Sequence, residues 1–185
     1  IIGLSRLKAM NFSCDYFELF GCPINYKIDL VLLDKRYHEL QSKFHPDRYM
    51  RESLHEQRLA VQYVSFVNQA YAELKSPLFR AKYLLSLQSI NFSDETHIVH
   101  DPLFLMEQIE LREKLADIRE TDQVSVALEK LKEDASLRYT EIQEMFEGQY
   151  NKNDFQVAFD SLAKMQFVSK FLDEIERLEE ELDDF

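Results

Sequence analysis

The chain has 185 residues and is 45% hydrophobic, which is enough to bury the core of one large domain or two small ones. Only 3 Gly and 4 Pro occur, so turns are few and an all-α protein is expected. The net charge of −12 is uneven, with 9 acidic and 8 basic residues over 11–75 but 25 acidic and 12 basic over 76–185. The acidic second part would repel a phosphate backbone, so nucleic-acid binding is not expected.

The first part of the chain predicts a helical hairpin. Asp15 to Gly21 reads as a short helix closed by glycine, and Asp29 can cap a longer helix that Pro46 ends. A second long helix is expected over about 53–74, and a short turn makes the pair antiparallel. The apolar stripes at helical spacing are Leu30, Leu33, Tyr37, Leu40 and Phe44 in the first helix, and Ala60, Tyr63, Val64, Val67, Tyr71 and Leu74 in the second.

The second part predicts three further long helices. Ser76-Pro77 and Asp101-Pro102 each combine a cap with a proline at the first helical position. We expect a short helix to about residue 85, a linker over 90–101, helices over about 102–118, 123–147 and 155–182, and a turn over 148–154. Thr121 or Asp122 is the expected cap of the middle helix. The chain thus divides into 11–88, a hairpin with a connecting helix, and 89–185, a three-helix bundle.

The stretch KFHPDRYM, Lys43 to Met50, joins the two hairpin helices and flanks a proline with two titratable side chains. Taken alone, it is compatible with a plain helix-stopping turn. As a catalytic pair, His45 and Asp47 lack a nearby nucleophile and a third, orienting group. We therefore do not expect an enzyme.

The context of this turn is more specific. HPD stands between the YHELQSKF pattern and a helix ending in FVNQAYAELKSP, which resembles a J-domain. Together with DYFELFG, FVNQAYAELKSPLFRAKYLLSL and DPLFLMEQIELREKL, the sequence over 15–185 resembles the HscB family of J-protein co-chaperones of iron–sulfur cluster assembly. The resemblance implies two partners, a heat-shock chaperone ATPase of the HscA type and an iron–sulfur scaffold protein of the IscU type.

The resemblance implies that the hairpin binds the chaperone ATPase. Proline stiffens the turn, so that Asp47 can pair with an arginine of the ATPase and His45 can form hydrogen bonds there. The basic helix that enters the turn would dock on an acidic patch, although its charges are also compatible with an ordinary solvated face. The implied chaperone-binding residues are Lys35, Arg36, Lys43, His45, Pro46, Asp47 and Arg48.

The helix from Pro102 has two apolar faces. At 100° per residue, Phe104, Leu111, Leu115 and Ile118 fall within about 60° of one another and form the expected core stripe. Leu105, Met106 and Ile109 form a second face edged by Glu110 and Glu113. By spacing alone, this second face suits either a partner or packing inside the protein. The family resemblance implies that these five residues bind the scaffold.

On the last helix, Phe167 lies at least about 140° from Leu162, Met165 and Leu172. Phe171, one turn further on, makes a core position equally compatible with the spacing. The family resemblance places Phe167 with the scaffold-binding residues.

No cofactor or metal is expected. His97 and His100 near acidic residues could hold a metal, but a polar linker has the same composition. Cys14 and Cys22 form no CxxC pair, so we expect reduced thiols and no zinc. No long apolar run occurs in the first twenty residues, so neither a signal peptide nor a membrane span is expected, and a cytoplasmic location fits. The alternatives left open are a J-protein serving another client and a metal carrier using His97 and His100.

Overall fold

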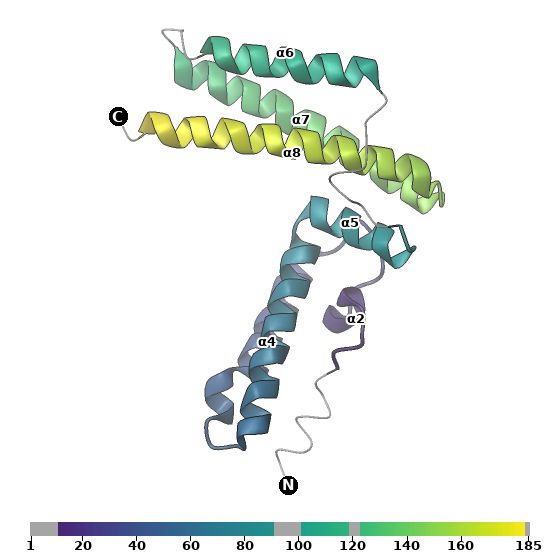
Figure 1. Ribbon diagram of the computed structural model, residues 1–185, viewed down its shortest axis with the longest axis vertical. Helices are drawn as coiled ribbons and strands as arrows, with labels where there is room; N and C mark the ends of the chain where they lie inside the picture. Colours follow the sequence, from purple (N-terminus) through teal and green to yellow (C-terminus); the bar gives the residue numbers. More distant parts are fainter. Residues whose placement is uncertain (1–10, 91–100, 119–122, 184–185) are drawn as a thin grey trace. The chain divides into compact units, whose positions relative to one another are not determined.

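The computed structural model describes residues 11–90, 101–118 and 123–183, and every regular element in these ranges is a helix (Figure 1). The all-α prediction is confirmed. The chain forms two compact units, 1–84 and 85–185, and the division falls within one helix. No helix in the described ranges is long and apolar enough to cross a membrane.

Unit 1 begins with two helices whose starts depend on aspartate caps. Helix α2 (Tyr16–Phe20) begins where the Asp15 carboxylate accepts the Glu18 N–H, and it ends at Gly21 with φ of 63°. That left-handed conformation favours glycine. Helix α3 (Leu30–Phe44) begins where the Asp29 carboxylate accepts the Leu32 N–H. The cap at Asp29 and the helix end at Gly21 were predicted from the sequence, because each depends on residues close along the chain.

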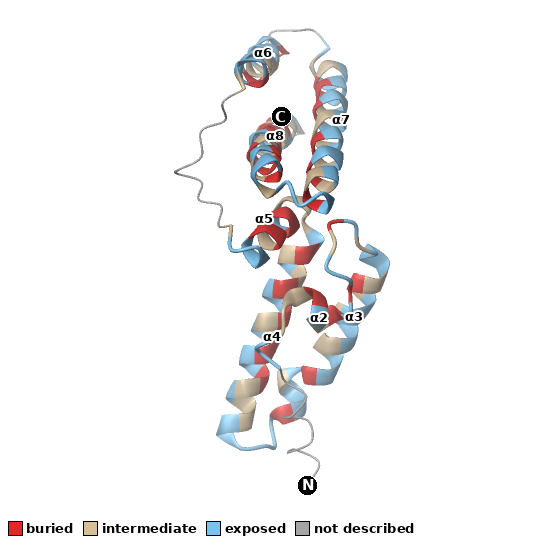
Figure 2. Cartoon of the chain, turned by 90° about the vertical axis from the view of Figure 1, so that its right-hand side faces the viewer, coloured by how far each residue is buried: buried red, intermediate tan, exposed pale blue. Residues whose placement is uncertain are grey.

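Helices α3 and α4 (Leu54–Lys75) form the predicted hairpin. Ser53 and Glu56 cap α4 reciprocally, each side chain accepting the other residue's backbone N–H. The buried faces of the two helices pack on each other (Figure 2). The centroids of the Phe44 and Tyr63 rings are 4.6 Å apart. One position of the predicted stripe departs from it: Leu30 is 45% exposed, because it lies in the first turn of α3, beyond the packed seam.

Arg80 secures the other end of the hairpin. It belongs to α5 (Pro77–Leu87) and its side chain is buried. The guanidinium donates to the carbonyls of Leu74, Lys75 and Tyr26 at 2.7, 3.2 and 2.8 Å. It thereby satisfies carbonyls at the end of α4, which have no partner within their own helix, and ties them to the loop before α3.

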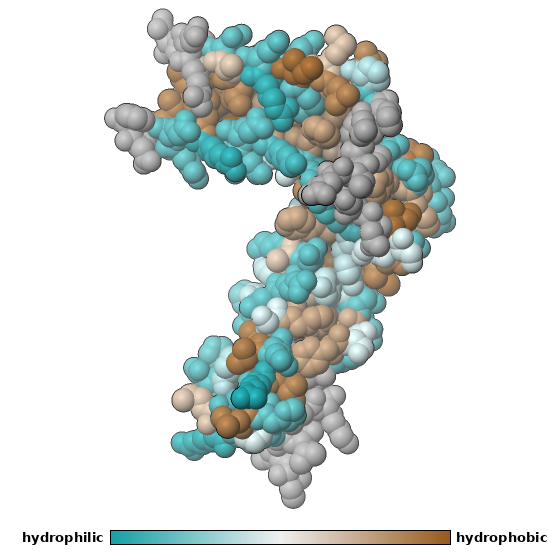
Figure 3. Space-filling model, in the orientation of Figure 1, coloured by the Kyte–Doolittle hydropathy of each residue, from teal (hydrophilic) through white to brown (hydrophobic). Residues whose placement is uncertain are grey.

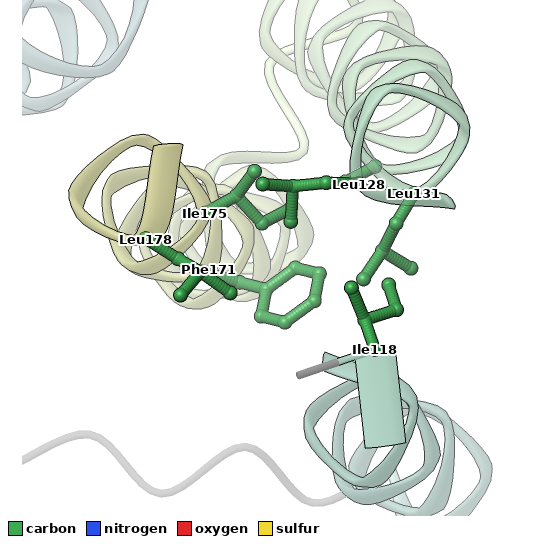
Figure 4. Close-up of a cluster of buried hydrophobic side chains, with 7 residues drawn as sticks. Ile118, Leu128, Leu131, Phe171, Ile175 and Leu178 are labelled. Atoms are coloured by element: carbon green, nitrogen blue, oxygen red, sulfur yellow. The ribbon is translucent and has the colours of Figure 1, made fainter. Parts of the chain in front are cut away.

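Unit 2 is a three-helix bundle of α6 (Pro102–Ile118), α7 (Val124–Asn151) and α8 (Phe155–Asp183). Figure 4 shows one layer of its core, in which side chains from all three helices point toward one another. Ile118 comes from α6, Leu128, Leu131 and Ala135 come from α7, and Phe171, Ile175 and Leu178 come from α8.

Two boundaries of α7 differ from the sequence prediction. The helix begins at Val124 with Gln123 at the N-cap position, and the cap expected at Thr121 or Asp122 falls on residues outside the described ranges. The helix also runs through Gly148 to Asn151, and the expected turn shrinks to the residues around Asn153, whose φ is 62°. The physical reason is Tyr150, which is buried and packs on Phe146 and Phe155, so the helix gains by continuing.

Candidate functional site

The His45-Pro46-Asp47 turn presents two polar side chains on a short, rigid segment. His45 ends α3, and the 3-10 helix η1 (Pro46–Tyr49) follows directly. The His45 Nδ1 accepts the Asp47 backbone N–H at 3.4 Å and lies 3.5 Å from the Asp47 carboxylate. Both side chains are exposed, at 53% and 76%, whereas Tyr49 anchors the turn in the core. The turn thus exposes an imidazole and a carboxylate side by side.

The predicted basic residues lie on or beside α3 and are exposed. Lys35, Lys43 and Arg48 line one shallow depression, which they share with Glu39. Arg36 lines a neighbouring depression with Lys43 and is ion-paired with Glu39 at 3.0 Å. The structure therefore brings three of the four cations together, and one carboxylate reduces the charge of the fourth.

An apolar surface that was not predicted from the sequence follows the turn. Met50, Leu54 and Val61 are 72%, 73% and 54% exposed, and Leu54 and Val61 line a shallow depression with Arg58. The signal was available, because Leu54 and Val61 are seven residues apart and lie off the apolar stripe of α4.

The second face predicted for α6 is exposed. Met106 and Ile109 are both 59% exposed and Leu105 is 36% exposed, whereas Phe104 on the core face is only 2% exposed. Glu110 and Glu113 are exposed beside them. Figure 3 shows apolar surface over α6 interleaved with hydrophilic surface. Packing of this face inside the bundle, the alternative left open by spacing, does not occur in the described ranges.

Phe167 is a further exposed apolar side chain, on α8. It is 37% exposed, while Leu162 and Met165 are fully buried, so Phe167 lies off the core face of its helix. Its ring meets that of Phe104 edge to face, with centroids 6.1 Å apart. Leu103, 80% exposed in the first turn of α6, was missed, although the same angular count places it beside Met106. We refer to Leu103, Leu105, Met106, Ile109, Glu110, Glu113 and Phe167 as the α6 patch.

Polar contacts hold α6 to the other two helices. Asp101 accepts the Phe104 N–H and is ion-paired with Lys164 of α8 at 2.5 Å. The Lys164 ammonium, followed by the Phe104 N–H, holds the pKa of the Asp101 carboxyl below its usual range. Two further pairs, Glu107 with Arg138 of α7 and Arg112 with Glu174 of α8, each have a 3.2 Å contact.

Gln108 lies in the middle of the core face of α6 and is 3% exposed. Neither atom of its side-chain amide has a hydrogen-bond partner among the described residues. A buried amide without partners costs stability. The inner face of α6 is therefore less apolar than the stripe of Phe104, Leu111, Leu115 and Ile118 predicted.

The metal alternative cannot be placed on the fold, because His97 and His100 lie outside the described ranges. Within those ranges, no group of three His, Cys, Asp or Glu side chains is arranged to hold a metal ion. Cys14 is partly buried and Cys22 is buried, and burial raises the pKa of both thiols.

Comparison with known proteins identifies the family. Residues 100–176 match the model of the HSCB C-terminal oligomerisation domain. A Proteus mirabilis protein named "Co-chaperone protein HscB" is 40% identical over 177 residues, covering 92% of this chain and 98% of the relative.

Two solved structures agree with this. The chaperone HscB from Vibrio cholerae is 37% identical with a TM-score of 0.83, covering 91% of this chain and 99% of that one. The human co-chaperone protein HscB is 30% identical with a TM-score of 0.84, covering 91% of this chain and 84% of that one. A helical hairpin followed by a three-helix bundle is thus the fold of a class of co-chaperones. This chain belongs to the HscB family.

Proposed function

We propose that this chain is a J-protein co-chaperone that stimulates the ATPase of an HscA-type chaperone and delivers to it an IscU-type iron–sulfur scaffold protein. The exposed His45-Pro46-Asp47 turn, in a chain of the HscB family, is the observation that carries the proposal. The chain would act as an activator rather than as an enzyme.

The turn and the basic face of α3 would form the chaperone-binding surface. Asp47 can pair with an arginine of the ATPase, and His45 can exchange hydrogen bonds there, because both side chains are exposed. The positive charges of three further residues, Lys35, Lys43 and Arg48, would speed association with an acidic surface of the ATPase. Binding that favours the hydrolysing conformation of the ATPase would raise its rate without any catalytic group from this chain.

The α6 patch would bind the scaffold. Its exposed apolar side chains supply area that water would otherwise cover, and Met adapts to an irregular partner surface. Glu110 and Glu113 at its edge would orient the partner and suit a basic counterpart.

The test is the steady-state ATPase rate of an HscA-type chaperone with this protein and an IscU-type scaffold, added singly and together. Synergistic stimulation by the two together is the expected result, because the chain would present one to the other. Stimulation that the scaffold does not enhance would assign the chain to a different client. No stimulation under either condition would overturn the proposed role.

A further inference from the structure

One cluster of three residues attaches the beginning of α6 to α8. The Asp101 carboxylate accepts the Phe104 N–H at 3.1 Å and is ion-paired with Lys164 at 2.5 Å. The Lys164 ammonium in turn lies 5.4 Å from the centre of the Phe104 ring. The Lys164 side chain is 19% exposed and the Asp101 side chain is 38% exposed, so water partly screens the pair from the Asp101 side. An ion pair, a helix cap and a cation–ring contact are thus formed by the same three residues.

This cluster adjoins both parts of the α6 patch. Leu105 and Met106 follow Phe104 directly on α6. Phe167 follows Lys164 by one turn on α8, and its ring contacts that of Phe104. The distance between the α6 and α8 parts of the patch therefore depends on how the beginning of α6 is attached.

Beyond this cluster, α6 is attached through the Glu107–Arg138 and Arg112–Glu174 ion pairs and, further along, through Leu111, Leu115 and Ile118. Its next inward-facing residue is Gln108, whose buried amide has no hydrogen-bond partner among the described residues. The hydrophobic layer shown in Figure 4 lies at the other end of the helix, around Ile118. The first turn of α6 is attached to α8 by the Asp101–Lys164 ion pair and by the contact of the Phe104 ring with that of Phe167.

We infer that Asp101 and Lys164 are positioning residues for scaffold binding, which hold the beginning of α6 so that Leu105 and Met106 stand beside Phe167 as one surface. The inference rests on the proposed function, since it takes the α6 patch as the scaffold-binding surface. Neither residue needs to touch the scaffold. Their effect on affinity comes from ordering the two parts of the patch before binding, which lowers the entropy cost of association.

The test measures the affinity of the full-length protein for an IscU-type scaffold by calorimetry. Lys164→Met removes the charge and keeps most of the side-chain volume, and Asp101→Asn keeps a good helix cap without the charge. Each should weaken binding about three- to tenfold. Lys164→Arg should restore the wild-type affinity, because the guanidinium can also pair with the carboxylate.

Lys132→Met is the matched control. Lys132 of α7 is ion-paired with Glu179 of α8, also at 2.5 Å, in the same unit but without any contribution from α6. Lys132→Met should lower the melting temperature of the protein by about as much as Lys164→Met does, and it should leave the affinity for the scaffold unchanged. A loss of affinity in Lys132→Met equal to that in Lys164→Met would overturn the inference, because it would then reflect bundle stability in general.

Amide hydrogen exchange over residues 104–110 provides a readout that needs no scaffold. Exchange should accelerate in Lys164→Met and not in Lys132→Met. Unchanged exchange, or unchanged affinity when the wild type binds the scaffold, would refute the positioning role. If the wild type itself fails to bind, it is the proposed function that fails, and the exchange result still decides whether the cluster holds α6.

Discussion

The role open to a single residue in this protein depends on whether its side chain faces water or the core. Asp47 is 76% exposed and makes no contribution to the core, so the fold does not require its charge. Arg80 is the opposite case, since its side chain is buried and its guanidinium donates to backbone carbonyls at the end of α4 and in the loop before α3. The Asp47 carboxylate is thus accessible to a partner, whereas the Arg80 guanidinium is engaged inside the fold.

Asp47→Asn should abolish stimulation of the chaperone ATPase while leaving the fold and scaffold binding intact. The amide keeps the shape of the side chain but loses the charge that would pair with an arginine. The measurement is the ATPase rate at saturating co-chaperone, with circular dichroism as the check on folding. Glu52→Gln is the control, as another exposed carboxylate close to the turn. Normal stimulation by Asp47→Asn would refute the role given to the turn.

Arg80→Ala should lower the free energy of unfolding by about 2–4 kcal/mol, because it leaves buried carbonyls at the end of α4 without a donor. Arg80→Lys should recover only part of this loss, since an ammonium cannot reproduce the planar fork of three donors. Urea unfolding followed by circular dichroism measures both. A loss below about 0.5 kcal/mol for Arg80→Ala would contradict the capping role.

At the scale of elements, α6 carries two faces with different tasks. Its inner face holds Phe104 and Ile118 in the core, but also the buried amide of Gln108. Its outer face exposes Leu105, Met106 and Ile109 to water. A helix that only packed in a bundle would need neither the polar interior residue nor the apolar exterior ones.

Replacing Leu105 and Met106 together by Ala should weaken scaffold binding by a few kcal/mol, as truncation of central interface anchors does. The fold should not change, because both side chains are exposed and Ala favours helix. Val126→Ala with Leu137→Ala is the matched control, since it truncates two apolar side chains of α7 that are 64% and 63% exposed. Equal affinity of the Leu105/Met106 variant and the wild type would exclude the α6 patch as the binding surface.

Gln108→Met should stabilise the bundle by about 1–3 kcal/mol. The thioether fills a similar volume and removes two buried polar atoms that lack partners among the described residues. Thermal unfolding followed by circular dichroism shows directly whether the melting temperature rises or falls. A lower melting temperature would mean that the amide does have a partner in the folded protein, such as a bound water.

At the scale of the whole molecule, the two compact units would divide the work. Unit 1 carries the turn and the basic face, and unit 2 carries the α6 patch and most of the negative charge. Helix α5 contributes to unit 1 through Arg80 and through Tyr83, whose ring stacks on that of Tyr16 at 4.3 Å. A fragment that ends at Lys75 lacks both contacts.

The fragment 11–88 should therefore fold and stimulate the chaperone weakly, without any enhancement by the scaffold. The scaffold should not enhance this stimulation, because the fragment lacks the α6 patch. The fragment 11–75 should be less stable, because the end of α4 loses the Arg80 cap. ATPase rates with and without the scaffold, together with melting curves of both fragments, test this. Scaffold-enhanced stimulation by 11–88 would contradict the division of work.

The features that sequence analysis predicted correctly are those in which the interacting groups are close along the chain. The predicted caps at Asp29, Ser76 and Asp101 join groups three residues apart, and apolar periodicity separates core positions from Met106 and Ile109. The turn and the α6 patch were found partly by such patterns and partly by family resemblance. Their roles in binding stay predictions.

Local caps and the helical period were enough to predict that the chain is all-α, which helices form and which residues of each could face water. They could not predict that Lys164 meets Asp101, 63 residues away, that Arg80 reaches the loop at Tyr26, or that α7 continues to Asn151 and buries Tyr150. The physical reason is that such contacts depend on which helices pack together, and no spacing within one helix encodes the side chains of another.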